Sequence, residues 1–200
     1  MSGSSRNVSA ADGWRAPLWA CAAAAAAIIA AAAGAEHLLG RKLWGINGEP
    51  GVWSGNVQSR HNSQFLFDPY TFSHITHGML WYGLMWLAAR RLPARLRILI
   101  AIAIESAWEV IENTDMVIRR YRAATISLHY FGDSIVNSMG DIAACIAGLM
   151  LAWLLPARLS ILFVVLLELI LALWIRDNIA LNVLMLIHPI RAIERWQMAA

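Results

Sequence analysis

Long apolar segments constrain this chain more than any other feature of its sequence. Hydrophobic residues make up 59% of its 200 residues, charged residues make up only 14%, and the mean hydropathy is +0.54. A soluble domain is nearer half apolar and a quarter charged. Because a helix needs about 20 apolar residues to cross a bilayer, the sequence predicts an all-α integral membrane helical bundle that forms one domain.

Five apolar runs approach spanning length, and we expect each to form a transmembrane helix. These runs cover residues 16–35, 71–89, 96–113, 133–155 and 159–175. They form a single predicted domain over residues 16–190, preceded by a flexible N-terminus over 1–15 and followed by a tail over 191–200. The apolar stretch 179–187 is too short to cross, which favours an interfacial helix or a re-entrant segment.

The first run has two interpretations. Its end, Ala33-Gly34-Ala35 before Glu36, is also similar to a signal-peptidase site. We favour a retained span over a cleaved signal, because the run is long for the apolar core of a signal peptide. Either outcome leaves the later spans unchanged.

The distribution of arginines predicts the orientation. The short segments 1–15, 90–97 and 156–158 hold seven arginines, whereas basic residues on the opposite side are spread over longer segments. The positive-inside rule places the short basic segments, and the N-terminus, in the cytoplasm. The long loop 36–70 then lies outside, and such loops are often functional. A net charge of +3, scattered along the chain, excludes a nucleic-acid partner and leaves membrane lipids as the expected surroundings.

Polar residues recur at helical spacing inside two of the apolar runs. Intervals of three or four residues separate the members of two sets, Glu105, Glu109 and Glu112, then Asp133, Asn137 and Asp141. Such spacing places each set on one helix face. Counting about 1.5 Å of rise per residue from the outer ends of the runs brings both sets, together with His74 and His77, to matching depths. Since carboxylates are costly in hydrocarbon, we expect one polar pocket that opens outward.

These residue types suggest roles within the pocket. Carboxylates that cannot all be ionised together suit acid–base catalysis; the candidates are Glu105, Glu109, Asp133 and Asp141. Imidazoles three residues apart, with a carboxylate, can bind a divalent metal; the candidate ligands are His74, His77 and Glu112. Guanidinium and amide groups near the mouth suit a phosphate; the candidate substrate-binding residues are Arg119, Arg122, Arg176, Asn113 and Asn137.

Each role has a structural alternative. The histidines can hydrogen-bond to neighbouring helices, and the arginines can pair with the acids or anchor to headgroups. The carboxylates can belong to a static hydrogen-bond network with Asn113, Asn137, Ser134 and Ser138. Two further features indicate packing alone: Cys21 and Cys145 are expected to be packed thiols, and Gly140, Ala144 and Gly148 form a small-residue ridge for close helix contact.

Three functions remain open, and the residues do not decide whether the protein is an enzyme. The first is action on a lipid or lipid-linked envelope substrate at the outer leaflet. The second is a proton- or ion-coupled carrier, although residues 76–89 and 145–155 are nearly apolar and offer few polar groups for a pathway. The third is a structural or assembly protein that binds a partner protein through loop 36–70. No Gly-rich phosphate loop, His-Glu-x-x-His or Gly-x-Ser-x-Gly motif supports a nucleotide-binding, zincin or serine-hydrolase function.

Three segments resemble an uncharacterised family of bacterial multi-pass inner-membrane proteins. They are Asp68–Gly78 (DPYTFSHITHG), Glu105–Asn113 (ESAWEVIEN) and Gly132–Ser138 (GDSIVNS). The resemblance covers nearly everything after residue 36 and implies a multi-pass protein of the bacterial inner membrane, without implying a reaction. The set Asp133, Asn137 and Gly140 is also similar to a pattern in VanZ-like membrane proteins, which implies a related fold alone.

Overall fold

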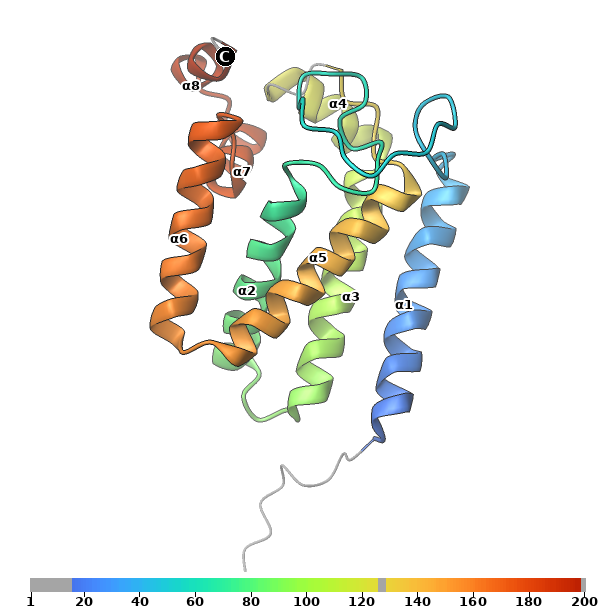
Figure 1. The fold of residues 1–200 in the computed structure, drawn as a ribbon, viewed down its shortest axis with the longest axis vertical. Coiled ribbons are helices and arrows are strands. Elements are labelled where there is room, and N and C mark those ends of the chain that lie inside the picture. The colour runs from blue at the N-terminus through green and yellow to red at the C-terminus, as the bar shows by residue number, and fades with distance from the viewer. Residues whose placement is uncertain (1–15, 126–128, 199–200) are drawn as a thin grey trace, which may run out of the picture.

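The computed structural model describes residues 16–125 and 129–198, and helices form its framework (Figure 1). The helices in these ranges are α1 (Leu18–Leu38), α2 (Thr71–Ala88), α3 (Ala94–Glu112), α4 (Asp115–Ala124), α5 (Ile135–Leu154), α6 (Ala157–Trp174), α7 (Ile179–Ile187) and α8 (Arg191–Met198). The same ranges contain no β-strand, only an isolated bridge between Trp53 and Phe67. The predicted all-α fold class is therefore confirmed. The flexible N-terminus predicted for residues 1–15 lies outside the described residues.

Five long helices run along the bundle, and successive ones point in opposite directions (Figure 1). Their bounds lie within three residues of the five apolar runs defined from the sequence. The loop between α1 and α2 lies at one end of the bundle together with α4, α7 and α8, and we call this the loop end. The opposite end carries the short α2–α3 and α5–α6 connections, and we call it the turn end.

Two short helices occupy segments in which the sequence showed no apolar run. α4 begins at Asp115, after the two-residue α3–α4 connection, Asn113-Thr114, and α8 covers most of the segment predicted as a tail. α8 is short but amphipathic, with its apolar residues Ile193 and Trp196 three positions apart and therefore on one face. Its Gln197 is buried against the body of the protein, which accounts for a helix in so polar a segment.

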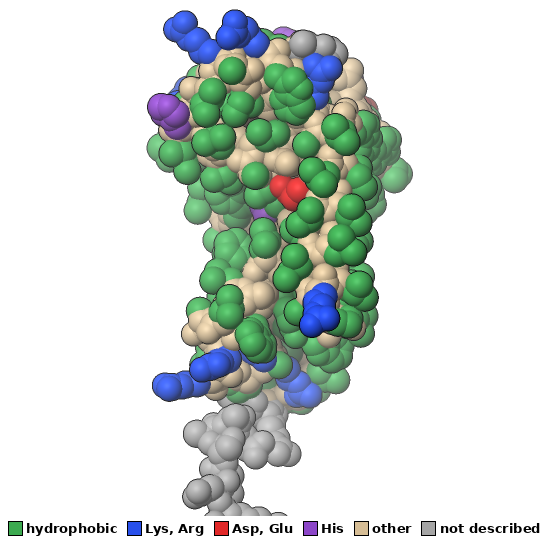
Figure 2. Space-filling view, turned by 90° about the vertical axis from the view of Figure 1, so that its left-hand side faces the viewer, with side chains coloured by type: hydrophobic (Ala, Val, Ile, Leu, Met, Phe, Trp, Pro, Cys, Tyr) green, Lys and Arg blue, Asp and Glu red, His purple; other side chains and the backbone are tan. Residues whose placement is uncertain are grey.

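The surface of the bundle is that of a membrane protein. α1, α5 and α6 are long and apolar enough to cross a membrane by length and composition. Figure 2 shows a broad hydrophobic belt along the visible face, with Lys and Arg side chains gathered near its two ends. Apolar side chains beside lipid tails and basic side chains at the headgroups are the distribution expected across a bilayer.

Glycines allow α2 and α5 to pack backbone against backbone. A Cβ atom at Gly78 would lie 2.0 Å from the carbonyl oxygen of Cys145, and one at Gly148 would lie 2.0 Å from that of Ile75. A Cβ atom at Gly140 would lie 2.2 Å from a carbonyl oxygen of the long loop. The predicted small-residue ridge on α5 is thus confirmed as a packing surface, and its close contact holds α2 beside the acidic residues of α5.

An apolar cluster fills the bundle toward the turn end. Ala101, Ile102 and Leu149 form its buried centre, and Trp81 and Tyr82 of α2 pack against it with parts of α1. In each helix these apolar residues lie between the polar residues and the turn end. The polar cluster is therefore confined to the half of the bundle nearer the loop end.

Candidate functional site

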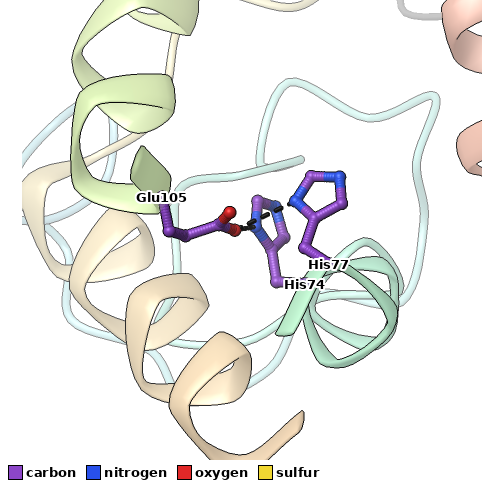
Figure 3. Close-up of side chains that lie close together, drawn as sticks. All are labelled: His74, His77 and Glu105. Atoms are coloured by element: carbon purple, nitrogen blue, oxygen red, sulfur yellow. Dashed lines mark hydrogen bonds and ion pairs between the residues drawn. The ribbon is translucent and has the colours of Figure 1, made fainter. Parts of the chain in front are cut away.

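Two histidines of α2 and one glutamate of α3 form the centre of a buried polar cluster (Figure 3). Oε1 of Glu105 lies 2.7 Å from Nδ1 of His74 and 3.0 Å from Nδ1 of His77. The other carboxylate oxygen, Oε2, accepts a 2.8 Å hydrogen bond from the Trp81 indole. Glu105 is fully buried, so these three neighbours replace the water that its carboxylate would otherwise bind.

Two further carboxylates lie against His74. Oε1 of Glu109 is 3.2 Å from its Nδ1, and Oδ2 of Asp141 is 3.9 Å from its Nε2. One Nδ1 hydrogen serves one acceptor, the nearer Glu105, and Oε1 of Glu109 is left without a hydrogen bond. In the part of the chain that the structure describes, only histidines form ion pairs with these three carboxylates. The cluster therefore contains more acidic than basic groups.

The start of α2 places the two histidines in this cluster. The Asp68 carboxylate accepts hydrogen bonds from the backbone N–H groups of Tyr70 (2.7 Å) and Ser63 (3.0 Å). Burial raises the pKa of Asp68, and these hydrogen bonds oppose that effect. Asp68-Pro69 thus forms a fixed turn beneath the long loop, and the helix begins at Thr71, with both histidines in its first two turns.

A second network joins the end of α3 to the start of α5. The Asn113 side-chain amide donates to Asp133 (3.0 Å) and to the Ser138 hydroxyl (3.2 Å), and its oxygen accepts from the Asp133 backbone N–H (2.7 Å). The Tyr130 hydroxyl also donates to the Asp133 carboxylate, at 3.0 Å. Burial raises the pKa of Asp133 to about 7. Asn113 is fully buried in these contacts, which matches the structural alternative for this residue.

Asn137 fastens the long loop to α5. Its side-chain amide donates to the carbonyl of Phe65 at 2.8 Å, and its backbone N–H donates to the Ser134 hydroxyl that caps the helix. Nearby, the Gln64 side chain donates to the Gly132 carbonyl at 2.7 Å. The end of the loop is therefore folded onto the bundle as a cover over the start of α2 and α5.

A cavity of about 70 Å³ adjoins the histidine cluster, with room for a few water molecules. Its lining comes from the loop, α2, α3, α4, α5, α7 and the segment before α5. Five of the residues singled out from the sequence lie in that lining: His74, His77, Glu112, Asp133 and Asp141. Glu112 therefore borders the cavity, while Glu105 is the glutamate that contacts both histidines.

The three candidate arginines lie apart from this cavity. Arg119 is exposed on α4. Arg122 donates to a backbone carbonyl just before α5 and lies 4.4 Å above the Phe131 ring. Arg176 donates to the Trp196 carbonyl at 2.7 Å and faces its ring. Arg122 thus joins α4 to the segment before α5, and Arg176 joins the end of α6 to α8.

One contributor to the site, Trp81, was not singled out from the sequence, and another, Tyr121, was expected only beside the arginines at the mouth of the pocket. Trp81 follows His77 by four residues, so helical spacing could have assigned it to the same face. Tyr121 lines the cavity and donates to Asn182 of α7 at 3.1 Å. No pattern in the sequence predicts that α4 and α7 meet, because each is too short to show a spanning run.

Another buried acid joins the C-terminal helices to Tyr70, the residue just before α2. The Asp177 carboxylate accepts hydrogen bonds from the Tyr70 hydroxyl (3.1 Å), Asn182 (3.3 Å) and Gln197 (3.2 Å). Burial raises its pKa to about 6 despite these donors. This acid is fully buried behind the cavity lining and anchors α7 and α8 to the rest of the bundle.

The fold and the buried cluster define a helical membrane protein with a polar site among its helices. The chain belongs to the family described as "Protein of unknown function (DUF2585)", whose model matches residues 37–199. The match includes every residue of the cluster and leaves out nearly all of α1. The resemblance found in the sequence motifs is thereby confirmed as an uncharacterised family.

Relatives in several bacteria match most of the chain. A UPF0314 protein of Sinorhizobium fredii is 52% identical over 163 residues, covering 81% of this chain and 82% of its own. The UPF0314 protein of Rhizobium meliloti is 51% identical over 163 residues, with coverage of 81% and 82%. That of Paracoccus denitrificans is 45% identical over 161 residues, with coverage of 80% and 83%. No solved structure matches this chain. The similarity to VanZ-like proteins stays a prediction.

Proposed function

We propose that this is a multi-pass protein of the bacterial inner membrane that performs acid–base chemistry on the polar head of a lipid or lipid-linked envelope substrate. The observation that carries the proposal is the placement of His74 against Glu105, Glu109 and Asp141 beside a cavity at the loop end. Buried ionisable groups among membrane helices are costly and usually mark a functional site.

The proposed topology has five spans. α1, α5 and α6 satisfy length and composition on their own, and α2 and α3 run alongside them with opposite directions (Figure 1). The turn end carries the short arginine-rich connections at 90–97 and 156–158, so the positive-inside rule places it, with the N-terminus, in the cytoplasm. The loop end and the cavity then face outward, toward the leaflet in which envelope precursors are used.

The cluster suits proton transfer. An imidazole held between carboxylates can pass a proton from one neighbour to another. Oε1 of Glu109 has no hydrogen bond and lies 3.2 Å from Nδ1 of His74, so it can exchange a proton with that imidazole. His77 is partly exposed and lines the cavity, which gives a substrate head access to the cluster.

A carrier function has less support. Below Glu105 the bundle is filled by the apolar cluster around Ala101, Ile102 and Leu149, with Trp81 and Tyr82 packed on it. A proton or ion pathway needs polar groups or water across this layer. The cavity therefore favours chemistry at one surface over transport between two.

Binding of a partner protein is the second candidate, because the long loop exposes apolar side chains. Leu43 and Val52 are 61% and 66% exposed, and Trp53 is 46% exposed. Apolar groups exposed on an outer loop suit contact with another protein or with the bilayer surface. This function would need the loop surface and would not need the buried carboxylates.

Complementation of a deletion strain separates the candidates. Wild type, Glu109→Gln and Glu168→Gln are expressed in turn, and lipids and envelope precursors are compared by mass spectrometry. Glu168 is the matched control, since it is a half-buried acid on α6 that accepts from the Ala180 backbone N–H and, within the described residues, forms no ion pair with either histidine of the cluster. We expect Glu168→Gln to restore the wild-type profile and Glu109→Gln to retain that of the deletion.

Full restoration by Glu109→Gln would contradict the proposed chemistry. If a double change to serine at Leu43 and Val52 then failed to restore the profile, the partner-binding function would gain support. Membrane abundance of each variant, measured by immunoblot, excludes loss of the protein as the cause.

A further inference from the structure

The histidine cluster contains the atoms of a metal site. Nδ1 of His74, Nδ1 of His77 and a carboxylate oxygen of Glu105 all lie within 4.8 Å of one another (Figure 3). We propose that these three side chains bind one divalent transition-metal ion at the base of the cavity. This proposal rests on the proposed function, because the ion would bind at the same site. Metal binding is measured directly, however, so the metal proposal and the acid–base proposal can fail independently.

The distances need only a small adjustment to fit an ion. Bonds of 2.0–2.1 Å to nitrogen and oxygen in a tetrahedral site separate neighbouring ligand atoms by about 3.3 Å. Oε1 of Glu105 is 2.7 Å from one ligand nitrogen and 3.0 Å from the other. Side-chain movements of roughly half an ångström would bring these two oxygen–nitrogen distances to that value. Both nitrogens already face the same oxygen from one helix, α2.

Glu109 supplies an independent observation. Its side chain is 1% exposed, and its Oε1 has no hydrogen bond although it lies 3.2 Å from Nδ1 of His74. A buried carboxylate oxygen without a donor is costly, and a cation in the cluster would satisfy it as a fourth ligand. The same cation would offset the excess of acids over histidines, which otherwise requires bound protons.

The surroundings also match those of bound metals. Metal-binding histidines usually direct their other ring nitrogen toward a carboxylate, and metal-binding carboxylates are themselves hydrogen-bonded. Nε2 of His74 faces Asp141 at 3.9 Å, and Oε2 of Glu105 accepts from Trp81 at 2.8 Å. These contacts outside the coordination sphere would hold the ligands in position, as they do in known metal sites.

The donor set indicates the class of metal. Two imidazoles with one or two carboxylates favour Zn²⁺ or Fe²⁺, whereas Mg²⁺ and Ca²⁺ prefer oxygen ligands alone. His77 borders the cavity, so the coordination sphere has one side toward the space that a substrate head would enter. A bound ion would supply a Lewis acid at that point.

Metal analysis tests the proposal. Protein is purified in detergent through a histidine-free affinity tag, stripped with a chelator and dialysed against Zn²⁺, and its metal is measured by mass spectrometry. Wild type and His188→Ala, a matched change at an exposed histidine, should each bind about one equivalent. His77→Ala and Glu105→Gln should bind at least about tenfold more weakly, the loss expected when a metal contact is removed. Equal binding by all four proteins, or no stoichiometric binding by wild type, would overturn the proposal.

A spectroscopic measurement on wild type covers the case in which those variants do not fold. Co²⁺ replaces Zn²⁺ in N/O sites and absorbs strongly in the visible region when it has four or five ligands. Intense d–d bands on Co²⁺ addition, removed by competing Zn²⁺, support the site. A weak six-coordinate spectrum like that of the hydrated ion overturns it. Failure here with a defective Glu109→Gln strain would remove the metal and leave the proposed acid–base function standing.

Discussion

The closest contact between α2 and α5 gives the sharpest test of the fold. Replacing Gly78 with alanine adds one methyl group, which would lie 2.0 Å from the Cys145 carbonyl oxygen and 2.8 Å from the Leu149 backbone nitrogen. Ordinary contacts of a Cβ atom are about 3.4 Å or longer. Both obstacles are helix backbone, which cannot rotate away as a side chain can, so the two helices must separate.

The size of the effect follows from two opposing contributions. Alanine favours a helix over glycine by about 1 kcal/mol, whereas forcing extra volume into a packed interface costs about 1–3 kcal/mol and at times more. An overlap of more than an ångström with backbone belongs at the upper end of that range. With the gain subtracted from the cost, we expect Gly78→Ala to lower the free energy of unfolding by about 2 kcal/mol, which corresponds to a fall of about 4–8 °C in Tm for a chain of this length.

Gly83 provides the matched control, because it lies in the same helix and a Cβ there would meet no atom within 4 Å. Gly83→Ala should leave Tm unchanged or raise it by about 2–4 °C through helix propensity. Thermal unfolding of both variants is followed in detergent by differential scanning fluorimetry. Equal Tm values for the two variants would refute the backbone-to-backbone packing of α2 on α5.

Three further outcomes are expected. The pKa of Asp177 is about 6 in the folded protein and near 3.8 in the unfolded chain. The protonated carboxyl therefore stabilises the fold below about pH 4, and this contribution of about 3 kcal/mol is lost as the pH rises through 6. The Tm of Asp177→Asn should accordingly rise relative to that of wild type between pH 5 and pH 7.5. Asn113→Leu should lower Tm by about 2–12 °C, because it leaves the buried Asp133 backbone N–H without its acceptor at about 1–3 kcal/mol; an unchanged Tm in the same fluorimetry would contradict that network. Trp81→Phe removes the donor to Glu105 and should weaken Zn²⁺ binding about tenfold or more, as measured by competition with a chromogenic chelator; it should also lower Tm, because the buried Oε2 of Glu105 loses its hydrogen bond.

The sequence predicts the long helices well because hydrocarbon imposes a strict pattern. Apolar runs of spanning length, ended by Pro93, Pro156 and similar breaks, define five helices to within three residues. α4 and α8 are less accessible to the same reasoning. Their stability comes from contacts made after folding, such as Gln197 with Asp177, and a short polar segment shows no sign of such a partner in advance.

The composition of the cluster is predictable, but its pairing is not. Helical spacing identifies the acidic faces of α3 and α5 and the histidine face of α2. The candidate metal ligands combined the histidines with Glu112, whereas the structure brings Glu105 to them, nearly two turns further from the end of α3. The first two turns of α2 thus lie beside Glu105 rather than beside the end of α3. Only tertiary structure sets this offset between the two helices.

The polar helix α3 lies inside the bundle and the apolar helices α1 and α6 lie outside, and this arrangement connects the fold to the site. α3 carries Glu105 and Glu109, which are 0% and 1% exposed, so its acids are shielded from the surrounding lipid by neighbouring helices. α1 and α6, which are apolar on almost every side, supply the exposed outer surface. In a bilayer the apolar helices carry no penalty outside, and polar groups are stable only inside. The polar cluster is thus stable only because the surrounding helices shield it from lipid. Packing of these helices does not require more carboxylates than histidines, so a purely structural role leaves the excess of carboxylates unexplained.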